Sequence, residues 1–316
     1  MRVTLSILLF VVFTAYSSAL PLARSSDDPF EQRAASKVKF YLYSKENPDI
    51  PQQLIVNNEI SVLDSNYDRS LHTKIIIHGW GGSYLTSPNK PLRDAYLSQK
   101  NYNIISVDYT YGRLDYFTAR AKAPSVGEAI AQFVDFMHDR LGLSFDMLVV
   151  IGHSLGAHVA GFCGKSVERG QLAAIVGLDP AYPFYSYGKH DSRLASTDAR
   201  FVETLQTNGN VKGFLKPIGT VSFYPNWGRL QPGCGQDLGG SCSHGRSVSL
   251  YAEAVRNFSF APIYKCDNFT NISEKSGCTS LQSNVQMGDP LLIRRVAGIF
   301  YLTTNAQAPY GYLSDS

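Results

Sequence analysis

One short stretch, residues 147–168, constrains the fold more than any other part of the chain. An apolar run at residues 147–151 leads into Gly152-His153-Ser154-Leu155-Gly156, and a helical pattern follows over residues 155–168. Glycines two residues before and after a serine are typical of a strand-to-helix turn so tight that larger side chains would collide with neighbouring elements. The stretch therefore predicts a serine hydroxyl raised above a sheet edge, at the positive end of a helix.

Three other runs, rich in Ile and Val, predict further buried strands: residues 74–80, where the strand runs into a Gly-rich turn, and residues 103–109 and 174–178. Continuous apolar strands favour a parallel sheet covered on both faces. Ser125 and Glu128 form a capping-box pattern ahead of an amphipathic helix that ends near Gly142. Strands alternating with helices predict an α/β fold with a mostly parallel central sheet and helices on both faces. Composition does not shift between residues 38 and 316, which predicts a single domain there.

Composition and charge exclude some other classes. Hydrophobic residues make up 44% of the 316, with 17 Phe and 19 Tyr, enough for a substantial core. There are 29 Lys and Arg against 26 Asp and Glu, and no long basic run. This balance gives no electrostatic basis for a nucleic-acid partner.

The N-terminal segment indicates export. Arg2 is followed by an apolar run at residues 3–16 and by the small residues Ser17, Ser18 and Ala19. This pattern predicts a signal peptide over residues 1–19, because the run is shorter than the ~20 residues of a membrane span. Residues 20–37 are polar and predict a flexible segment or a propeptide. No later run is long and apolar enough for a transmembrane segment, so we expect a secreted, extracellular protein.

The cysteines and sequons are compatible with secretion. The simplest pairing joins Cys234 to Cys242 and Cys266 to Cys278, since each bond closes a short loop. Cys163 remains, within a helical stretch, and we expect it to be buried. Sequons for N-glycosylation occur at Asn257, Asn268 and Asn271.

A serine needs a histidine to take its proton and a carboxylate to orient that histidine. In hydrolases with this turn the chain order is serine, acid, histidine. His190 lies in a polar loop, and His158 lies on the helix after Ser154, where it packs or meets solvent. His244 follows Cys242 and precedes a helical stretch at residues 246–257. We therefore assign His244 as the base.

Asp179 is the preferred acid. It ends the run at residues 174–178 and is followed by Pro180. The carboxyl ends of neighbouring parallel strands meet at one sheet edge, so Asp179 should lie on the same edge as Ser154. Asp191 and Asp198 are alternatives in loop-like sequence.

Two backbone N–H groups are expected to form the oxyanion hole. Leu155, the residue after the serine, supplies one. The Gly-rich segment His78-Gly79-Trp80-Gly81-Gly82 follows an earlier strand, and Trp80 would supply the other.

Together these motifs resemble the pancreatic-lipase-like family of secreted α/β-hydrolases. The resemblance covers residues 38–316 and is strongest at residues 78–82, 152–164, 177–181, 223–226 and 231–247. It implies an α/β-hydrolase fold. It also implies Ser154 as nucleophile, Asp179 as acid, His244 as base, and Trp80 and Leu155 as oxyanion donors.

The chain departs from the digestive triacylglycerol lipases of that family. Their long lid corresponds here to the loop between Cys234 and Cys242, which holds three glycines and Leu238 as its one clearly apolar residue. Such a loop cannot form an amphipathic lid helix. The preceding loop, residues 207–220, is also short. Both features resemble the phospholipase A1 members, including arthropod enzymes. The chain stops at Ser316 without the family's C-terminal β-sandwich, so colipase is not expected.

The resemblance does not imply a cofactor or a metal. Some relatives hold calcium with acidic residues in the loop after the catalytic acid. Asp198 is present in the matching stretch, but Ala195 and His190 stand where further acids would be needed.

The sequence thus predicts a phospholipase A1 that cleaves the sn-1 acyl ester of a phospholipid or related glycerolipid at a lipid interface. A neutral triacylglycerol lipase or a galactolipase is the alternative, since a short lid admits several head groups. A non-catalytic lipid-binding or yolk-type relative is a third reading, which the intact Ser154, Asp179 and His244 oppose. With so small a lid, activity should not rise sharply when substrate aggregates.

Overall fold

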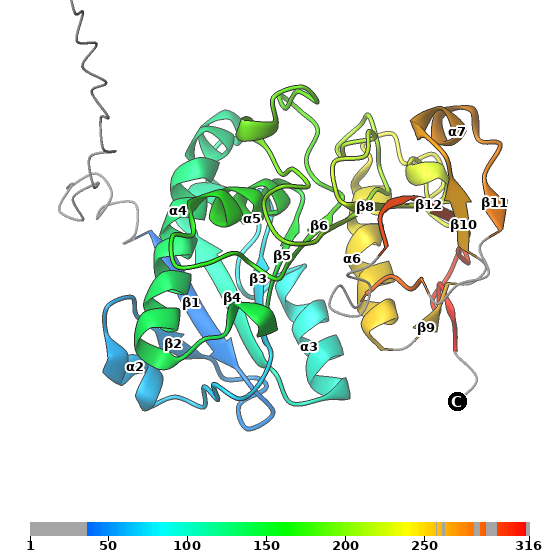
Figure 1. Ribbon diagram of the computed structural model, residues 1–316. Helices are drawn as coiled ribbons and strands as arrows, with labels where there is room; N and C mark the ends of the chain where they lie inside the picture. The colour runs from blue at the N-terminus through cyan, green and yellow to red at the C-terminus, as the bar shows by residue number, and fades with distance from the viewer. Residues whose placement is uncertain (1–36, 257, 261–262, 281–284, 289–295, 314–316) are drawn as a thin grey trace, which may run out of the picture.

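The computed structural model describes residues 37–256, 258–260, 263–280, 285–288 and 296–313 (Figure 1). The expected signal peptide, residues 1–19, lies outside the described residues, as do residues 20–36 and the sequon asparagine Asn257.

Within the described residues, eleven strands form one sheet in the order β11-β10-β12-β8-β7-β6-β5-β3-β4-β1-β2. Their bounds are β1 Val38–Tyr43, β2 Gln52–Leu54, β3 Thr73–Ile77, β4 Asn103–Tyr109, β5 Leu148–His153, β6 Ala174–Leu178, β7 Val202–Leu205, β8 Val221–Pro225, β10 Ile263–Cys266, β11 Thr279–Ser280 and β12 Gly298–Leu302. A separate pair joins β9 Phe258–Ser259 to β13 Tyr312–Leu313.

The centre of the sheet is parallel, as predicted. Neighbours from β4 through β3, β5, β6, β7 and β8 to β12 all pair in parallel. Antiparallel strands are confined to the two edges, β1 with β2 and β10 with β11. Ser154 and Asp179 therefore follow the carboxyl ends of two adjacent strands, β5 and β6.

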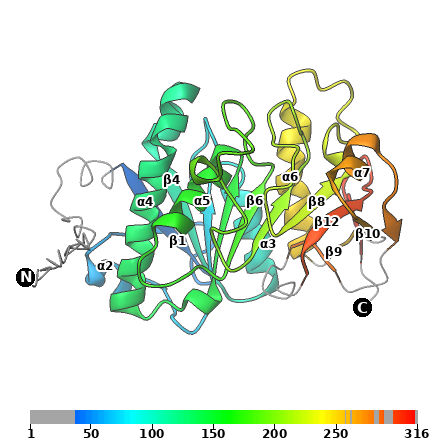
Figure 2. The same cartoon turned by 45° about the horizontal axis from the view of Figure 1, so that its top comes forward.

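Helices cover both faces of the sheet, which also agrees with the prediction (Figure 1). Figure 2 shows the central strands running side by side between α4 and α6. The helices are α2 Glu59–Leu63, α3 Asn89–Gln99, α4 Tyr116–Leu141, α5 Leu155–Ser166, α6 Ser241–Val255 and α7 Phe269–Glu274, with the short 3₁₀ turns η1 Thr110–Arg113, η2 Phe145–Met147, η3 His190–Ser192 and η4 Asn226–Gly228.

The core is divided by the sheet into two apolar layers. Ile75 and Ile77 of β3 pack with residues of α4 and α5, whereas Ile76 packs on the other side with residues of α3 and α6. The alternation arises because successive side chains of a strand point to opposite faces. Each central strand therefore contributes apolar side chains to both layers.

The capping-box prediction at Ser125 and Glu128 is wrong. The N-cap of helix α4 is Asp115, ten residues before Ser125, and its side chain accepts a hydrogen bond from the Thr118 amide at 3.0 Å. The Ser-x-x-Glu pattern follows Pro124, which commonly marks a helix start, but here the proline lies inside the helix. The end of the helix matches: Gly142 adopts φ 73° as its C-cap.

Both predicted disulfide pairs are present in the structure, Cys234–Cys242 and Cys266–Cys278, and Cys163 is free and buried. The second bond closes the loop that contains α7 and the sequon residues Asn268 and Asn271. No helix among the described residues has the length and apolarity needed to cross a membrane.

Candidate active site

Ser154 sits in a turn that only glycine-flanked sequence can form. Its backbone has φ 57° and ψ −122°, between the end of β5 and the start of α5. A Cβ on Gly152 would lie 2.1 Å from the Gly156 carbonyl oxygen, and a Cβ on Gly156 would lie 2.4 Å from the carbonyl oxygen of His78. Both glycines are therefore required for close packing of β5, α5 and the end of β3.

Asp179 is held in one orientation by three hydrogen bonds. Its carboxylate is buried, and Oδ1 accepts hydrogen bonds from the amides of Thr207 (2.8 Å) and Asn208 (3.0 Å). The other oxygen, Oδ2, lies 2.5 Å from Nδ1 of His244. A Cβ on Gly213 would lie 2.2 Å from Oδ1, so this glycine makes room for the carboxylate. The arrangement leaves one oxygen of Asp179 for the histidine.

His244 lies in the first turn of α6, not before it, because α6 begins at Ser241 rather than near Arg246. The earlier start comes from Asp237, whose carboxylate accepts hydrogen bonds from the amides of Cys242 (3.1 Å) and Ser243 (2.7 Å). A side-chain cap of this kind satisfies amides that have no partner within the helix. The sequence prediction does not include Asp237, although a carboxylate four residues before the helix start at Ser241 is a signal for a cap.

Ser154 is linked to the Asp179–His244 pair through neighbouring residues. The Ser154 amide donates to the Leu178 carbonyl at 2.9 Å, and its carbonyl accepts from the Ala181 amide at 3.1 Å. On the other side, the His153 ring lies 4.5 Å from the His244 ring, centroid to centroid. Ser154 is thus bracketed by the residues that flank the acid and by a residue that touches the base.

The alternatives to Asp179 and His244 lie elsewhere. His190 and Asp191 are exposed in η3. His158 is buried and contacts the Ala181 carbonyl at 2.7 Å. Asp198 is buried in an ion pair with Lys165. None of these groups makes a contact with His244.

Lys165 lies in the region where the resemblance raised the question of calcium. Its ammonium group contacts the Asp198 carboxylate and donates to the Arg193 carbonyl at 3.1 Å. A side-chain cation therefore neutralises this carboxylate. Across the described residues, no group of three His, Cys, Asp or Glu side chains could hold a metal ion.

The Gly-rich segment after β3 lies against the serine. A Cβ on Gly79 would lie 2.9 Å from the Ser154 Cβ and 3.5 Å from its Oγ. Residues 79–82 form a turn in which the Gly82 amide donates to the Gly79 carbonyl at 3.2 Å and Gly81 adopts φ 75°. Such a turn requires a positive φ at its third residue, hence glycine. Trp80 occupies the second position, and Leu155 is the first residue of α5, whose amide has no acceptor within the helix.

His78 supports this turn from below, a role that the sequence did not reveal. Its Nδ1 lies 2.8 Å from the Gly79 carbonyl oxygen, and its ring stacks on Tyr109 with centroids 4.2 Å apart. The Tyr109 hydroxyl donates to the His78 carbonyl at 2.9 Å. The ring is completely buried, so the turn is fixed to β4.

Four aromatic side chains form a group next to the turn, which we call the aromatic cluster: Trp80, Tyr116, Phe117 and Phe184. Ring centroids are 5.7 Å apart for Trp80 and Tyr116, 6.2 Å for Tyr116 and Phe184, and 4.5 Å for Phe117 and Phe184. The Trp80 indole N–H donates to the Leu114 carbonyl at 2.7 Å. Exposed fractions are 54% for Trp80, 46% for Leu114, 64% for Phe117 and 58% for Phe184.

The loop closed by Cys234 and Cys242 forms turns and irregular backbone over residues 234–240 before α6 begins, and it contains no lid helix of its own, as predicted from its glycines. Leu238 at its tip is 88% exposed. The loop covers little, and its main contribution is the Asp237 cap on α6.

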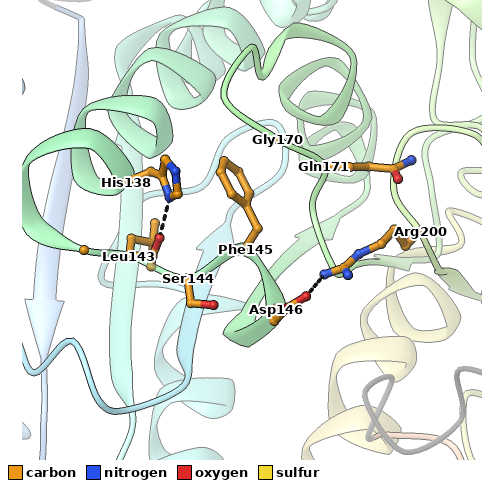
Figure 3. A pocket seen from close by; sticks show the side chains of 9 residues that line it. His138, Leu143, Ser144, Phe145, Asp146, Gly170, Gln171 and Arg200 are labelled. Atoms are coloured by element: carbon orange, nitrogen blue, oxygen red, sulfur yellow. Dashed lines mark hydrogen bonds and ion pairs between the residues drawn. The ribbon is translucent and has the colours of Figure 1, made fainter.

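A pocket of about 490 Å³ lies at the amino ends of the central strands, opposite the end that carries Ser154 (Figure 3). It is lined by segments that precede β5, β6 and β7, including Phe145, Gln171 and Arg200. Figure 3 shows Arg200 paired with Asp146, at 2.5 Å, and His138 bonded through Nδ1 to the Leu143 carbonyl, at 2.8 Å. The pocket is separated from Ser154 by the length of β5, about 20 Å for a strand of six residues.

The parallel sheet, its two helical layers and the serine turn define an α/β-hydrolase. The family model described as Lipase matches residues 15–310. The chain is 32% identical over 266 residues to lipase member H of Xenopus tropicalis, covering 81% of this chain and 56% of that protein. It is 35% identical over 241 residues to phospholipase A1 member A of Rattus norvegicus (74% and 52%) and 32% identical over 278 residues to lipoprotein lipase of Mus musculus (79% and 58%). This chain belongs to the lipase family.

The matched region spans little more than half the length of these curated relatives. Among solved structures, Est1E from Butyrivibrio proteoclasticus aligns with 45% of this chain and 46% of its own, at 18% identity and a TM-score of 0.28. The relatives carry different activity names, so family membership alone leaves the substrate open.

Proposed function

We propose that this protein is a serine esterase that acts on glycerolipids, most specifically a phospholipase A1 that cleaves the sn-1 acyl ester. The observation that carries the proposal is the 2.5 Å contact between Asp179 Oδ2 and His244 Nδ1, beside the strained turn of Ser154. A buried carboxylate on one imidazole nitrogen leaves the other nitrogen to accept the serine proton.

The reaction follows the two-step acyl-enzyme route. Ser154 Oγ attacks the ester carbonyl carbon while its proton moves to His244 Nε2. Collapse of the tetrahedral intermediate breaks the ester C–O bond, and His244 returns the proton to the departing glycerol oxygen. A water molecule then attacks the acyl-enzyme with the same base, which releases a fatty acid and frees Ser154.

The Trp80 and Leu155 amides are the proposed donors to the oxyanion. Gly79, which precedes Trp80, lies against Ser154, and Leu155 directly follows Ser154, so both proposed donors belong to segments that adjoin the nucleophile. Each such donor contributes about 3–4 kcal/mol of transition-state stabilisation in related chemistry.

The aromatic cluster supports a substrate presented at a lipid surface. Trp and Tyr rings favour the boundary between lipid and water, since their apolar bodies enter the lipid while their polar groups stay solvated. The cluster adjoins the Gly79–Gly82 turn and remains exposed without any movement of a lid. A bound bilayer would therefore lie next to Ser154.

The small loop between Cys234 and Cys242 favours a phospholipid over triacylglycerol. Its turns hold Leu238 alone as an exposed large apolar side chain, so it offers little cover for a fully apolar substrate and leaves room for a head group. A galactolipid would fit the same opening, and a neutral lipase remains the alternative, in keeping with the lipoprotein lipase among the relatives.

Two disulfides support export into an oxidising compartment, since such bonds are rare in reducing cytosol. We infer an extracellular protein, and its recovery from culture medium with a glycan on the exposed Asn268 would test this.

The decisive test of the enzymatic proposal is covalent labelling. The wild-type protein should react with a fluorophosphonate probe and hydrolyse p-nitrophenyl butyrate, and Ser154→Ala should lose the label and about 10⁴-fold or more of the rate. An unlabelled wild-type protein that still binds lipid would favour the non-catalytic reading.

A head-group panel tests the substrate. Phosphatidylcholine, a galactolipid and triolein are offered side by side, and release of the sn-1 fatty acid from phosphatidylcholine should be fastest. Faster hydrolysis of triolein would replace the phospholipase assignment by a neutral lipase.

A further inference from the structure

His153, the residue before Ser154, has no part in the two-step reaction, yet it touches the base in two ways. Its ring lies 4.5 Å from the His244 ring at an interplanar angle of 44°. Its Nε2 lies 3.2 Å from the His244 carbonyl oxygen. Because a carbonyl oxygen only accepts, Nε2 carries the proton in this contact.

Other contacts fix the His244 backbone, but few fix its ring. The His244 amide donates to the Gly240 carbonyl at 2.9 Å, and Ser247 Oγ donates to the His244 carbonyl at 2.9 Å. The imidazole itself is held at one edge by Asp179. A single hydrogen bond at Nδ1 still permits the ring to tilt about that bond. The His153 ring lies against the His244 ring and limits its movement in that direction.

The charge state of His153 suits this place. Burial, and then the nearness of His244, lower the pKa of His153 to about 3, so its ring is neutral near neutral pH. During the proposed reaction His244 becomes positively charged, and a second cation at this distance would oppose that step. Lys212 also acts on His153 in the direction that keeps it uncharged.

We propose that His153 is a positioning residue for the base, holding the His244 imidazole in the orientation that faces Ser154 and tying the first turn of α6 to the serine turn. The proposal rests on the proposed function, because it assigns His153 a role in the turnover by Ser154 and His244. His153 acts through His244 and need not touch substrate.

The test compares turnover and binding in His153→Ala with p-nitrophenyl butyrate, a soluble ester. A displaced catalytic group typically costs about 10- to 100-fold in rate, so kcat should fall by that factor while KM stays within about twofold. His153→Phe keeps a ring against His244, and His153→Gln keeps a donor for its carbonyl. Each should recover part of the lost kcat.

His138 provides the matched control. It makes the same two kinds of contact, with a carbonyl oxygen 2.8 Å from Nδ1 and a ring centroid 4.8 Å away, that of Phe145 (Figure 3). His138 lies near the amino ends of the central strands, in the pocket described above. His138→Ala should lower the melting temperature, as expected for lost packing, and leave kcat unchanged.

A proton NMR spectrum separates positioning from general stability. The proton between Asp179 and His244 should give a low-field signal in the wild type and in His138→Ala, and this signal should shift or broaden in His153→Ala. Failure of the proposed function is recognised beforehand, by a wild-type protein that neither turns over the ester nor takes the fluorophosphonate label.

Two results would overturn the role of His153 in an active enzyme. One is a kcat for His153→Ala within about twofold of the wild type; the other is an equal loss of kcat in His138→Ala. Should His153→Ala give no folded protein, wild-type kcat values in both His153→Phe and His153→Gln would be equally decisive against the role.

Discussion

The nucleophile and the base are held by different kinds of force. Ser154 is held by steric exclusion: a methyl group on Gly152, Gly156 or Gly79 would collide with atoms of the adjoining turn, strand or helix. His244 is held by polar contacts and a covalent bond, through Asp179, the Asp237 cap and the Cys234–Cys242 disulfide. We call the surroundings of Ser154 the steric side and those of His244 the polar side. The steric side has no space for added atoms, whereas the polar side can lose one contact while the protein still folds. Substitutions on the two sides should therefore fail differently.

The largest effect on the polar side is expected from Asp179→Asn. An amide fits the same space but favours the wrong imidazole tautomer, so kcat should fall about 10⁴-fold with little change in melting temperature. The measurement is kcat with a soluble ester beside a thermal melt. A variant that retains a tenth of wild-type kcat or more would show that another group orients His244.

On the steric side, Gly152→Ala should prevent correct folding rather than slow catalysis. The added Cβ would lie 2.1 Å from a backbone oxygen, which no rotamer can relieve, and overpacking of this kind costs about 3 kcal/mol or more.

Gly245→Ala is the matched control for that substitution. Gly245 is next to His244 in α6, and its added Cβ would meet nothing within 4 Å. Removing a helix-interior glycine should stabilise the protein by about 0.5–1 kcal/mol. Denaturant melts of the two variants measure the difference, and equal stabilities would refute the steric account.

The two disulfides should differ in their effect on catalysis but not on stability. Loss of either short cross-link should cost about 2–3 kcal/mol of stability. Cys234→Ser with Cys242→Ser should also lower kcat several-fold, since that bond closes the loop that caps the helix of His244. Cys266→Ser with Cys278→Ser should leave kcat unchanged. Thermal melts and kcat measurements on both double variants test this. Equal kcat values in the two variants would show that the Cys234–Cys242 bond does not help to position His244.

The smallest effect is expected from Asp237→Asn, and it should depend on pH. Burial raises the pKa of Asp237, but bonds from Ser243 and Cys242 outweigh it and lower the net pKa below its ordinary value. A depressed pKa means that the carboxylate adds stability at neutral pH and loses it as pH falls through the folded-state pKa.

The cap at Asp237 should contribute about 1 kcal/mol at pH 7, as caps commonly do. The difference in stability between the wild type and Asp237→Asn should shrink in acid. A stability difference that stays constant from pH 7 to strongly acidic solution would show that the negative charge of Asp237 does not contribute to the cap.

The features that the sequence predicts correctly are those with local determinants. The strand, the Gly-x-Ser-x-Gly turn and the following helix lie within about twenty residues, and neighbouring strand ends placed Asp179 on the edge of Ser154. Strands β4 and β6 match their predicted ranges, residues 103–109 and 174–178.

Contacts between distant segments could not be predicted in the same way. That His153 packs on His244 depends on where α6 docks, and nothing in the sequence next to either residue specifies it. The start of α4 was misplaced because Asp115 and Pro124 both offer local start signals, and tertiary packing of Ala119 and Ala123 decides between them.

The exposed rings of Trp80, Phe117 and Phe184 have a practical consequence for handling this protein. Solvent-exposed aromatic rings adsorb to hydrophobic surfaces. The purified protein should therefore adsorb to plastic and bind to phenyl-substituted hydrophobic-interaction resins. A trace of mild detergent should release it, with the micelle taking the place that a cell's lipids would fill.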